Sequence, residues 1–427
     1  MRKVLVITYY WPPAGGPGVQ RWLKFVKYLK GFNIEPIVYV PRNPSYPILD
    51  ENLISEIPEG IQILKQPIKE PYSWASLLSK KKTQTISSGI IQERKVSTVE
   101  KILLWIRGNL FIPDARKFWV KPSIKYLSEI IKKEEIKTIV TSGPPHSLHL
   151  IGLGLKEQQE IHWITDFRDP WTSIGYHKKL RLTKSSERKH KELEKRVLNS
   201  ADKIVVTSDT TKREFEQITN KPIQVITNGY DEILDAVSLD PNFTISHIGS
   251  LLTGRNPIAL WQAIKELVEE HETFKSHLKI QLAGVVGEEV VKSIRKYGLD
   301  SYTKHLGYLS HEKVLDVQQS SQVLLLLEID SEETKGIIPG KLFEYLNAKR
   351  PILAVGPNGW EAGTIVKETN SGEVCRQNDK TVLKNVLLDW FGKYEKGELQ
   401  FNSKEIEKYH RKELTKALAN FIQWESS

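Results

Sequence analysis

The chain has 427 residues, of which 39% are hydrophobic and 27% charged, and its formal net charge is +10. This length and composition predict two or three globular domains with substantial cores and exclude an intrinsically disordered chain. The single cysteine, Cys375, excludes an internal disulfide and a cysteine-ligated metal cluster, which favours the cytoplasm. No stretch reaches the roughly 18 apolar residues that a membrane-spanning helix requires, so we expect any membrane contact to be peripheral.

Strands and helices are expected to alternate from the N-terminus. The first apolar run follows Met1-Arg2-Lys3 as in a signal peptide, but it is short and ends at Pro12-Pro13 without a cleavage site, so it is predicted to be a strand. The predicted strands of this series are Lys3–Tyr10, Glu35–Val40, Ile136–Thr141, His162–Thr165, Lys203–Thr207 and Ile223–Ile226. The predicted helices are Gly18–Gly31, one ending near Lys156, Glu187–Leu198 and Thr210–Gln217. Such alternation predicts an α/β fold with a parallel, doubly wound sheet.

The loop after the first strand is rich in glycine, with Gly15, Gly16 and Gly18 before a helix. A dinucleotide fingerprint fits poorly, because the third glycine is missing and the next strand ends at Val40-Pro41-Arg42 without an acid. The glycines suit close approach of a sugar or phosphate to the backbone, and a purely structural tight turn remains an alternative.

An insertion at about 45–121 interrupts the first series. Its part from 71 to 121 carries ten Lys/Arg and three Asp/Glu together with Trp74, Trp105, Phe118 and Trp119. Basic and aromatic residues together are typical of elements that bind anionic membranes. They are equally compatible with solubilising lysines around core tryptophans, and no nucleic-acid-binding motif accompanies them.

A second series of strands and helices follows and predicts a second domain. Its predicted strands are Thr244–His247, Lys279–Ala283, Val323–Ile329 and Pro351–Val355, and its helices are Pro257–His271, Gly287–Tyr297, His311–Ser320 and Lys341–Lys349. The predicted domains are therefore 1–231 and 232–403, and a last helix over 404–427 has no strand after it.

The segment before the helix at Lys341 has the layout of a nucleotide site. Gly336, Pro339 and Gly340 break the chain, so the free N–H groups of the helix and the charge of Lys341 would attract an anion. Glu344, one turn later, could accept the two vicinal hydroxyls of a ribose. One nucleoside diphosphate would satisfy both features, whereas the alternative is an ordinary helix with a solvated Glu344.

This segment resembles the donor-binding region of family-4 glycosyltransferases, in which an acid is followed by seven residues and a second acid inside a short helix. Glu344 matches the second acid, and Gly336 occupies the position of the first, for which Glu332 or Glu333 could substitute. The resemblance extends over most of the chain and is greatest to transferases of surface-polysaccharide assembly. It implies the glycosyltransferase B fold, with two Rossmann-like domains facing a central cleft and a last helix that crosses back to the first domain.

The resemblance also implies roles for particular residues. On the donor side, Arg255 and Lys341 would neutralise the leaving diphosphate, and the binding set would comprise Gly249, Arg255, Gly307, Gly340, Lys341, Leu342 and Glu344. On the acceptor side, His146 would be catalytic, and contacts would come from Gly15, Gly16, Gly18, Asp166, Arg168 and Asp169. The alternatives are an exposed Arg255 without a ligand and a buried Asp–Arg pair that only holds a loop; His149, inside an apolar helix, is predicted to be structural.

The function implied is transfer of a sugar, with retention, from a nucleoside-diphosphate sugar to a hydroxyl of a glycan or lipid-linked glycan. No metal and no cofactor are expected, and the expected place is the cytoplasm or the inner face of its membrane. Two alternatives remain: a sugar-nucleotide 2-epimerase of related fold, and a non-catalytic subunit that binds a sugar nucleotide or a polyanion.

Overall fold

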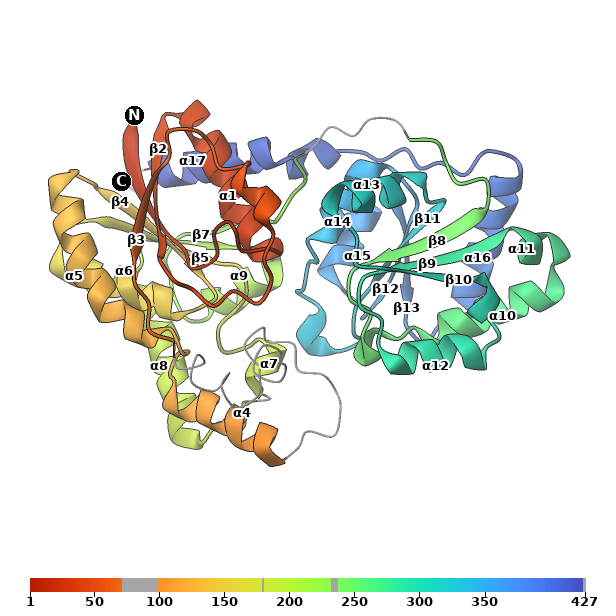
Figure 1. Cartoon of the computed structure of the whole chain (residues 1–427), viewed down its shortest axis with the longest axis horizontal. Helices are drawn as coiled ribbons and strands as arrows, with labels where there is room; N and C mark the ends of the chain where they lie inside the picture. Colours follow the sequence, from red (N-terminus) through yellow and green to blue (C-terminus); the bar gives the residue numbers. More distant parts are fainter. Residues whose placement is uncertain (71–97, 179, 232–236, 425–427) are drawn as a thin grey trace. The chain divides into compact units, whose positions relative to one another are not determined.

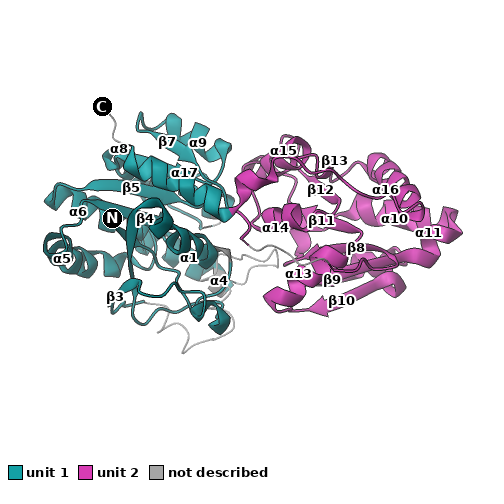
Figure 2. Ribbon diagram, turned by 90° about the horizontal axis from the view of Figure 1, so that it is seen from above, with its two compact units in different colours: residues 1–228, 411–427 teal, residues 229–410 magenta. Residues whose placement is uncertain are grey.

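The computed structural model describes residues 1–70, 98–178, 180–231 and 237–424 (Figure 1). The chain divides into two compact units: unit 1 comprises Met1–Asn228 and Arg411–Ser427, and unit 2 comprises Gly229–His410 (Figure 2). Each unit is built on one parallel sheet, which confirms the predicted α/β class with two Rossmann-like parts. The division after Asn228 falls three residues before the predicted boundary at Asp231.

Unit 1 contains a sheet of seven strands in the order β3-β2-β1-β4-β5-β6-β7. The strands are β1 (Arg2–Ile7), β2 (Ile34–Pro41), β3 (Gln62–Gln66), β4 (Thr138–Gly143), β5 (His162–Phe167), β6 (Lys203–Val206) and β7 (Ile223–Val225). All neighbouring pairs are parallel, with Leu5 opposite both Ile37 and Ile139. The order reverses between β1 and β4, which makes the carboxyl ends of these two strands the expected ligand position.

Helices cover both faces of this sheet. The helices are α1 (Pro17–Leu29), α4 (Thr98–Leu110), α5 (Lys117–Lys133), α6 (Ser147–Gln158), α7 (Gly175–Lys178), α8 (Lys184–Ser200), α9 (Asp209–Glu216) and α17 (Arg411–Gln423). Val4 packs with Trp22 of α1 and Leu418 of α17 on one face. Leu5 packs with residues of α5, α6 and α8 on the other, as the alternation of side chains along a strand requires.

Unit 2 contains a sheet of six strands in the order β10-β9-β8-β11-β12-β13. The strands are β8 (Phe243–Ile248), β9 (Leu278–Ala283), β10 (Thr303–Gly307), β11 (Val323–Leu327), β12 (Ile352–Gly356) and β13 (Gly372–Arg376). The helices are α10 (Ile258–Glu270), α11 (Glu272–His277), α12 (Glu288–Lys296), α13 (His311–Ser320), α14 (Lys341–Ala348), α15 (Glu361–Glu368) and α16 (Lys380–Glu395). Here the strand order reverses between β8 and β11, whose carboxyl ends define the second expected ligand position.

Three strands were not predicted from the sequence, and all three lie at an edge of a sheet. These strands are β3, β10 and β13, and most of their residues are half-buried or exposed. An edge strand is covered less completely than a central one, so it does not need the continuous apolar run by which the central strands were recognised.

The last helix begins later than predicted. α17 starts at Arg411, whereas Ile406 and Tyr409 form a short 3-10 turn whose side chains are buried in the core of unit 2. From Arg411 on the chain belongs to unit 1, where α17 packs on α1. The prediction of a terminal helix from Lys404 is therefore wrong in its first residues, because Ile406 and Tyr409 belong to another core.

The basic insertion is only partly described. Trp74 and the lysines at 80–82 lie outside the described residues, whereas α4 and α5 are well defined. Trp105 and Phe118 are 42% and 50% exposed, but Trp119 is buried and stacks on Tyr39 with ring centroids 4.9 Å apart. Trp119 is therefore a core residue. Among the described helices, none is long and apolar enough to span a membrane.

Candidate functional site

Lys341 places its amine at the end of β8, where the strand order of unit 2 reverses. As the first residue of α14, it reaches over the sheet and donates from Nζ to the carbonyl oxygen of Ile248 at 3.0 Å. Nζ also lies 3.3 Å from Nε2 of His247, whose Nδ1 lies 2.9 Å from the carbonyl oxygen of Leu325. Since Nδ1 donates to that carbonyl, Nε2 is the acceptor for Lys341.

Arg255 and Glu328 form an ion pair at the same carboxyl ends of the unit 2 strands. Glu328 directly follows β11 and is completely buried, and its two carboxylate oxygens accept from Nε and Nη2 of Arg255 at 2.9 and 3.0 Å. A bidentate pair of this kind fixes the guanidinium plane. Within the described part of the chain, Nη1 of Arg255 has no hydrogen-bond partner, and the Arg255 side chain is 33% exposed. One edge of the guanidinium therefore remains for an anion.

Burial and neighbouring cations lower the affinity of Lys341 and His247 for protons. Desolvation, followed by repulsion from Arg255, lowers the pKa of Lys341 to about 7, although Glu328 and Glu344 act in the opposite direction. Burial and the neighbouring Lys341 hold the pKa of His247 well below its usual range, so His247 is neutral. A bound phosphate would relieve this repulsion and restore the charge of Lys341.

Glycines lie at the carboxyl ends of the neighbouring strands of unit 2. Gly249 has φ +111°, and a Cβ there would lie 3.6 Å from Nζ of Lys341. Gly284, after β9, has φ +106°, and a Cβ there would lie 2.8 Å from the carbonyl oxygen of Gly249. These positions allow only glycine without strain, so the strand ends stay open to a ligand. The predicted Gly307 is the last residue of β10 and also has a positive φ, +65°.

The remaining predicted donor residues lie on or next to α14. Glu344 is half-buried and accepts from Nε2 of Gln318 at 2.9 Å. Gly340 precedes the helix, and the side chain of Leu342 is completely buried in the core. The expectation of free N–H groups is wrong for the first turn, because Leu342 donates to Pro339 at 3.0 Å and Phe343 donates to Gly340 at 3.3 Å. The tight turn uses these N–H groups, so the Lys341 side chain is the better anion ligand.

Unit 1 has a pocket of about 300 Å³ of its own. It is lined by Tyr10, Arg107, Pro113, Asp114, Arg116, Pro144, Pro145, His146, Asp169, Trp171, Ile174, His177, Leu180 and His190. His146 precedes α6, is 5% exposed and stacks on Trp171 with ring centroids 5.0 Å apart and an interplanar angle of 2°. Both ring nitrogens of His146 lack a hydrogen-bond partner in the described structure. A buried polar group without a partner indicates a place for a ligand.

The histidine side chains that line this pocket are polar but uncharged. Burial, then repulsion from His149 and Arg168, holds the pKa of His146 well below its usual range. Burial, then repulsion from His190, lowers the pKa of His177 to about 4. These imidazoles are neutral at pH 7, and a neutral imidazole can both donate to and accept from a hydroxyl group. These side chains suit a polyhydroxylated ligand.

Asp166, predicted to contact the acceptor, does not line this pocket. It is completely buried within β5 and accepts from Nη2 of Arg21 at 2.8 Å, from Nε1 of Trp22 at 2.7 Å and from Oγ of Ser142 at 2.8 Å. These donors saturate the carboxylate, so the prediction for Asp166 is wrong. Asp166 and Arg21 form a buried Asp–Arg pair. Such a purely structural pair had been considered for Arg168 and Asp169 instead.

The other acceptor-side residues are distributed around the ends of β1, β4 and β5. Asp169 is exposed and lines the pocket. Arg168 donates to the carbonyl oxygen of Pro144, and a Cβ at Gly18 would overlap its guanidinium. Gly18 is therefore required by the packing of Arg168, which joins two loops at the strand-order reversal. A Cβ at Gly15 would lie 2.9 Å from Ile48, whereas Gly16 has φ +93° with nothing near.

Several residues of both sites escaped the sequence analysis. Glu328 carried a signal, since it is an acid directly after four leucines, but the predicted strand extended past it. His247 lies inside β8, and nothing in the sequence distinguished it from its neighbours. Trp171 and His190 could not be connected from the sequence, although Nε1 of Trp171 donates to Nδ1 of His190 at 3.1 Å. His149, predicted to be structural, is buried beside Thr141 at 2.9 Å.

Known proteins share both the fold and part of the sequence pattern. Residues 92–232 match the profile of Glycosyltransferase Family 4. The structure resembles the lipopolysaccharide outer core galactosyltransferase WaaB, with a TM-score of 0.58 and 14% identity over 98% of this chain and 99% of that one. It resembles Anabaena HepE in complex with UDP, with a TM-score of 0.59 and 12% identity over 99% and 95%. For a putative UDP-N-acetylglucosamine 2-epimerase from Listeria monocytogenes the values are 0.55 and 13% over 98% and 95%. No curated protein matches the sequence.

Two parallel sheets of Rossmann type, in the strand orders described, are the architecture of the glycosyltransferase B fold, and a cationic site lies where the strand order of unit 2 reverses. The match at residues 92–232 and this fold make the chain similar to the family-4 glycosyltransferases. The fold implied by the resemblance in the sequence is confirmed, and the sub-type stays a prediction.

The affinity for UDP is expected to fall as the pH rises from about 7 to about 8.5. Free Lys341 loses its proton near pH 7, whereas a bound diphosphate keeps it protonated, so each binding event above that pH must take up a proton. The dissociation constant should then rise by up to about tenfold per pH unit. Titration calorimetry in two buffers of different ionisation enthalpy measures the uptake. Lys341→Arg should abolish it, and equal uptake in this variant would assign the proton to another group.

Proposed function

We propose that the enzyme transfers a sugar, with retention of anomeric configuration, from a nucleoside-diphosphate sugar to a hydroxyl of a glycan or lipid-linked glycan during assembly of a cell-surface polysaccharide. The observation that carries this proposal is the cluster of Lys341, Arg255 and Glu328 at the strand-order reversal of unit 2. Two cations above glycine-ended strands suit a diphosphate. The likeness to HepE in complex with UDP and to the galactosyltransferase WaaB supports the choice of donor and acceptor class.

In the proposed mechanism, unit 2 binds the donor and stabilises the leaving group. Lys341 and the Nη1 edge of Arg255 contact the diphosphate, and Glu328 fixes Arg255 from behind. Negative charge on the diphosphate grows as the glycosidic bond breaks, so these cations stabilise the transition state more than the ground state. Glu344 accepts the ribose hydroxyls, and Gln318 holds its carboxylate in place.

The pocket of unit 1 is proposed to bind the acceptor. The unpartnered nitrogens of neutral His146 would orient the hydroxyl that attacks the donor sugar, and exposed Asp169 would contact a neighbouring hydroxyl. Stacking on Trp171 fixes the His146 ring, so its hydrogen bonds have a defined direction. Gly336 stands where the family pattern has its first acid, so the sugar contacts of that acid must come from other groups.

Product analysis with a panel of UDP- and GDP-sugars tests the function. A transferase consumes the donor only when a glycan acceptor is present and yields a new glycosidic bond, whose proton coupling constant reports the anomeric configuration. An epimerase would convert UDP-N-acetylglucosamine without any acceptor, and a binding subunit would consume nothing. Either of these outcomes would overturn the proposal, and an inverted anomeric centre would overturn its stereochemistry.

The two sites are expected to separate in mutant kinetics. His146→Phe keeps the ring on Trp171 but removes both nitrogens, and it should lower kcat/KM for the acceptor at least about tenfold while the UDP affinity stays unchanged. Glu344→Gln should do the reverse and weaken donor binding by about 1–3 kcal/mol. Steady-state kinetics with each substrate varied, together with UDP titration, measure both. Loss of UDP affinity in His146→Phe would place His146 on the donor side.

A further inference from the structure

We propose that an exposed face of unit 1 docks on an anionic lipid surface. This face, called the α4–α8 face, is formed by α4, the start of α5 and the start of α8. Its apolar members are Ile102, Trp105, Leu110 and Phe118, and its basic members are Lys117, Lys121, Arg181, Lys184 and Lys189.

The apolar members are exposed to an unusual degree. Ile102, Trp105, Leu110 and Phe118 are 54%, 42%, 55% and 50% exposed. The opposite side of α4 is packed on unit 1, since Leu104 is buried and a Cβ at Gly108 would lie 2.6 Å from Leu182. The helix therefore has an inner side that the fold uses and an outer apolar side that it does not. Exposed apolar groups gathered on neighbouring helices, here α4 and the start of α5, mark an interaction surface.

Hydrogen bonds join the three elements into one face. Oδ1 of Asn109 accepts from the N–H of Thr183 at 2.8 Å, and Nδ2 donates to the carbonyl oxygen of Arg181 at 3.2 Å. Lys117 donates from Nζ to Leu110 at 2.6 Å and lies 5.4 Å from the ring centroid of Phe118. In Figure 1, α4 lies close to α8, and the contacts of Asn109 place the last residues of α4 beside the start of α8. The apolar side chains and the start of α8 are thus neighbours.

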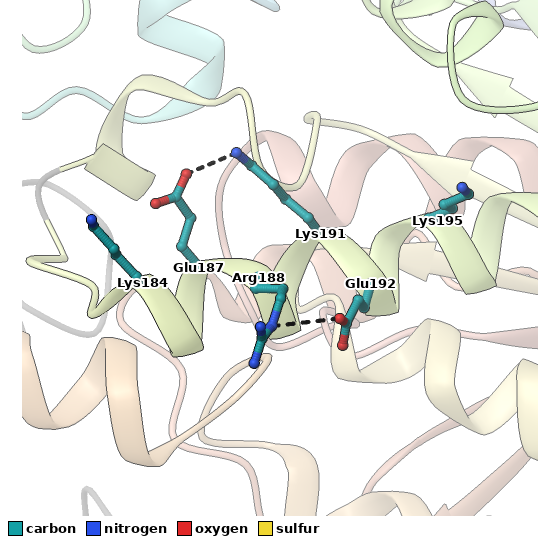
Figure 3. A pocket seen from close by; sticks show the side chains of 6 residues that line it. All are labelled: Lys184, Glu187, Arg188, Lys191, Glu192 and Lys195. Atoms are coloured by element: carbon teal, nitrogen blue, oxygen red, sulfur yellow. Dashed lines mark hydrogen bonds and ion pairs between the residues drawn. The ribbon is translucent and has the colours of Figure 1, made fainter.

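The basic members add positive charge that carboxylates do not neutralise. On α8, Glu187 pairs with Lys191 at 2.8 Å and Glu192 with Arg188 at 3.7 Å, whereas Lys184 has no ion pair in this view (Figure 3). Among the described residues, Lys189 and Lys121 likewise have no carboxylate within ion-pair distance. Burial, then repulsion from Lys189, lowers the pKa of Lys117.

Apolar anchors beside unpaired cations fit the boundary between lipid headgroups and acyl chains. The cations meet anionic headgroups, and the tryptophan, phenylalanine and aliphatic side chains enter the acyl region. A nucleic acid would use the cations but would leave Ile102 and Leu110 in water. Arg107, from the inner side of α4, lines the pocket of unit 1, so docking would hold that pocket at the level of the headgroups. An acceptor attached to a lipid would then not have to leave the membrane.

Flotation of the purified full chain with vesicles tests the docking. The protein should float with vesicles of phosphatidylcholine containing phosphatidylglycerol, and not with phosphatidylcholine alone. Lys184→Gln combined with Lys189→Gln should lower the partition coefficient about thirtyfold at low salt, from about 1 kcal/mol per basic residue. The matched control, Lys367→Gln with Lys396→Gln, removes the same charge from exposed positions of unit 2 and should change nothing. If both double variants lost the same amount of vesicle binding, the effect would come from net charge alone, and the assignment of the α4–α8 face would be overturned.

A probe on α4 tests the apolar contact separately. The only native cysteine, Cys375, is 4% exposed, and burial raises the pKa of its thiol to about 11, so a Trp105→Cys variant can be labelled selectively with an environment-sensitive fluorophore. The emission should shift to the blue on anionic vesicles, whereas a label on Lys367→Cys should not respond. No shift at position 105, or the same shift with single-stranded DNA, would overturn the lipid assignment. Because neither measurement requires turnover, failure here leaves the transferase assignment untouched.

Discussion

Replacing Lys341 by Met is expected to lower kcat by about a hundred- to a thousandfold. The amine lies at the end of β8, held by Ile248 at 3.0 Å, where the proposed diphosphate gains charge in the transition state. Methionine keeps most of the aliphatic volume and removes only the cation, so the thermal unfolding midpoint should change little. Steady-state kinetics at saturating donor and acceptor measure the effect. Lys367→Met, at an exposed position of α15, is the matched control and should retain full activity.

Arg255 is a less direct probe of the same charge. Arg255→Ala would leave the completely buried Glu328 carboxylate without its partner, and this uncompensated anion would itself repel a diphosphate. A loss of activity in Arg255→Ala therefore combines a missing cation with a new unpaired anion. Lys341→Met creates no such anion, since no carboxylate pairs with Lys341 among the described residues. An unchanged kcat and UDP affinity in Lys341→Met would remove Lys341 from the diphosphate site.

The central strands of both sheets could be predicted from the sequence because they are covered on both faces. β1, β4, β8 and β11 each contain a run of buried residues, which the sequence displays directly. The Lys341 helix could also be predicted, because Gly340 and Pro339 mark its start. The edge strands β3, β10 and β13 could not, since their half-exposed residues show neither an apolar run nor a clear alternation, whereas the edge strand β7 was predicted.

The errors within the sites arise from strand ends that were misplaced by two residues. β5 was predicted to end at Thr165 but ends at Phe167, which places Asp166 inside the sheet and not beyond it. β11 was predicted to end at Ile329 but ends at Leu327, which places Glu328 beyond the strand, beside Arg255. Boundaries are the least certain part of a prediction from sequence, and here they decide whether a carboxylate is structural or lines a site. Glu332, which was considered for the missing acid, is instead largely exposed and pairs with Lys335 at 2.7 Å.

The buried position of Asp166 leads to the second large expected effect. Asp166→Ala should lower the free energy of unfolding by about 3–5 kcal/mol, because the guanidinium of Arg21, with 1% of its side chain exposed, would remain buried and unpaired. Burial alone would raise the pKa of Asp166, but Arg21, Ser142 and Trp22 lower it overall. Its stabilising contribution is therefore present at neutral pH and is lost only as the pH falls below about 3.9, the value in the unfolded chain.

Urea unfolding at neutral pH, followed by circular dichroism, measures this loss as a fall in the transition midpoint. Asp169→Ala is the matched control: residue Asp169 is exposed, whereas Asp166 is completely buried, so the free energy of unfolding should change by no more than about 0.5 kcal/mol. A double variant, Arg21→Met with Asp166→Ala, removes the charge that the single change leaves unpaired and should recover part of the lost stability. If the double variant were less stable than Asp166→Ala by the full cost of Arg21→Met, the two side chains would act independently, and the paired structural role of Asp166 would have to be abandoned.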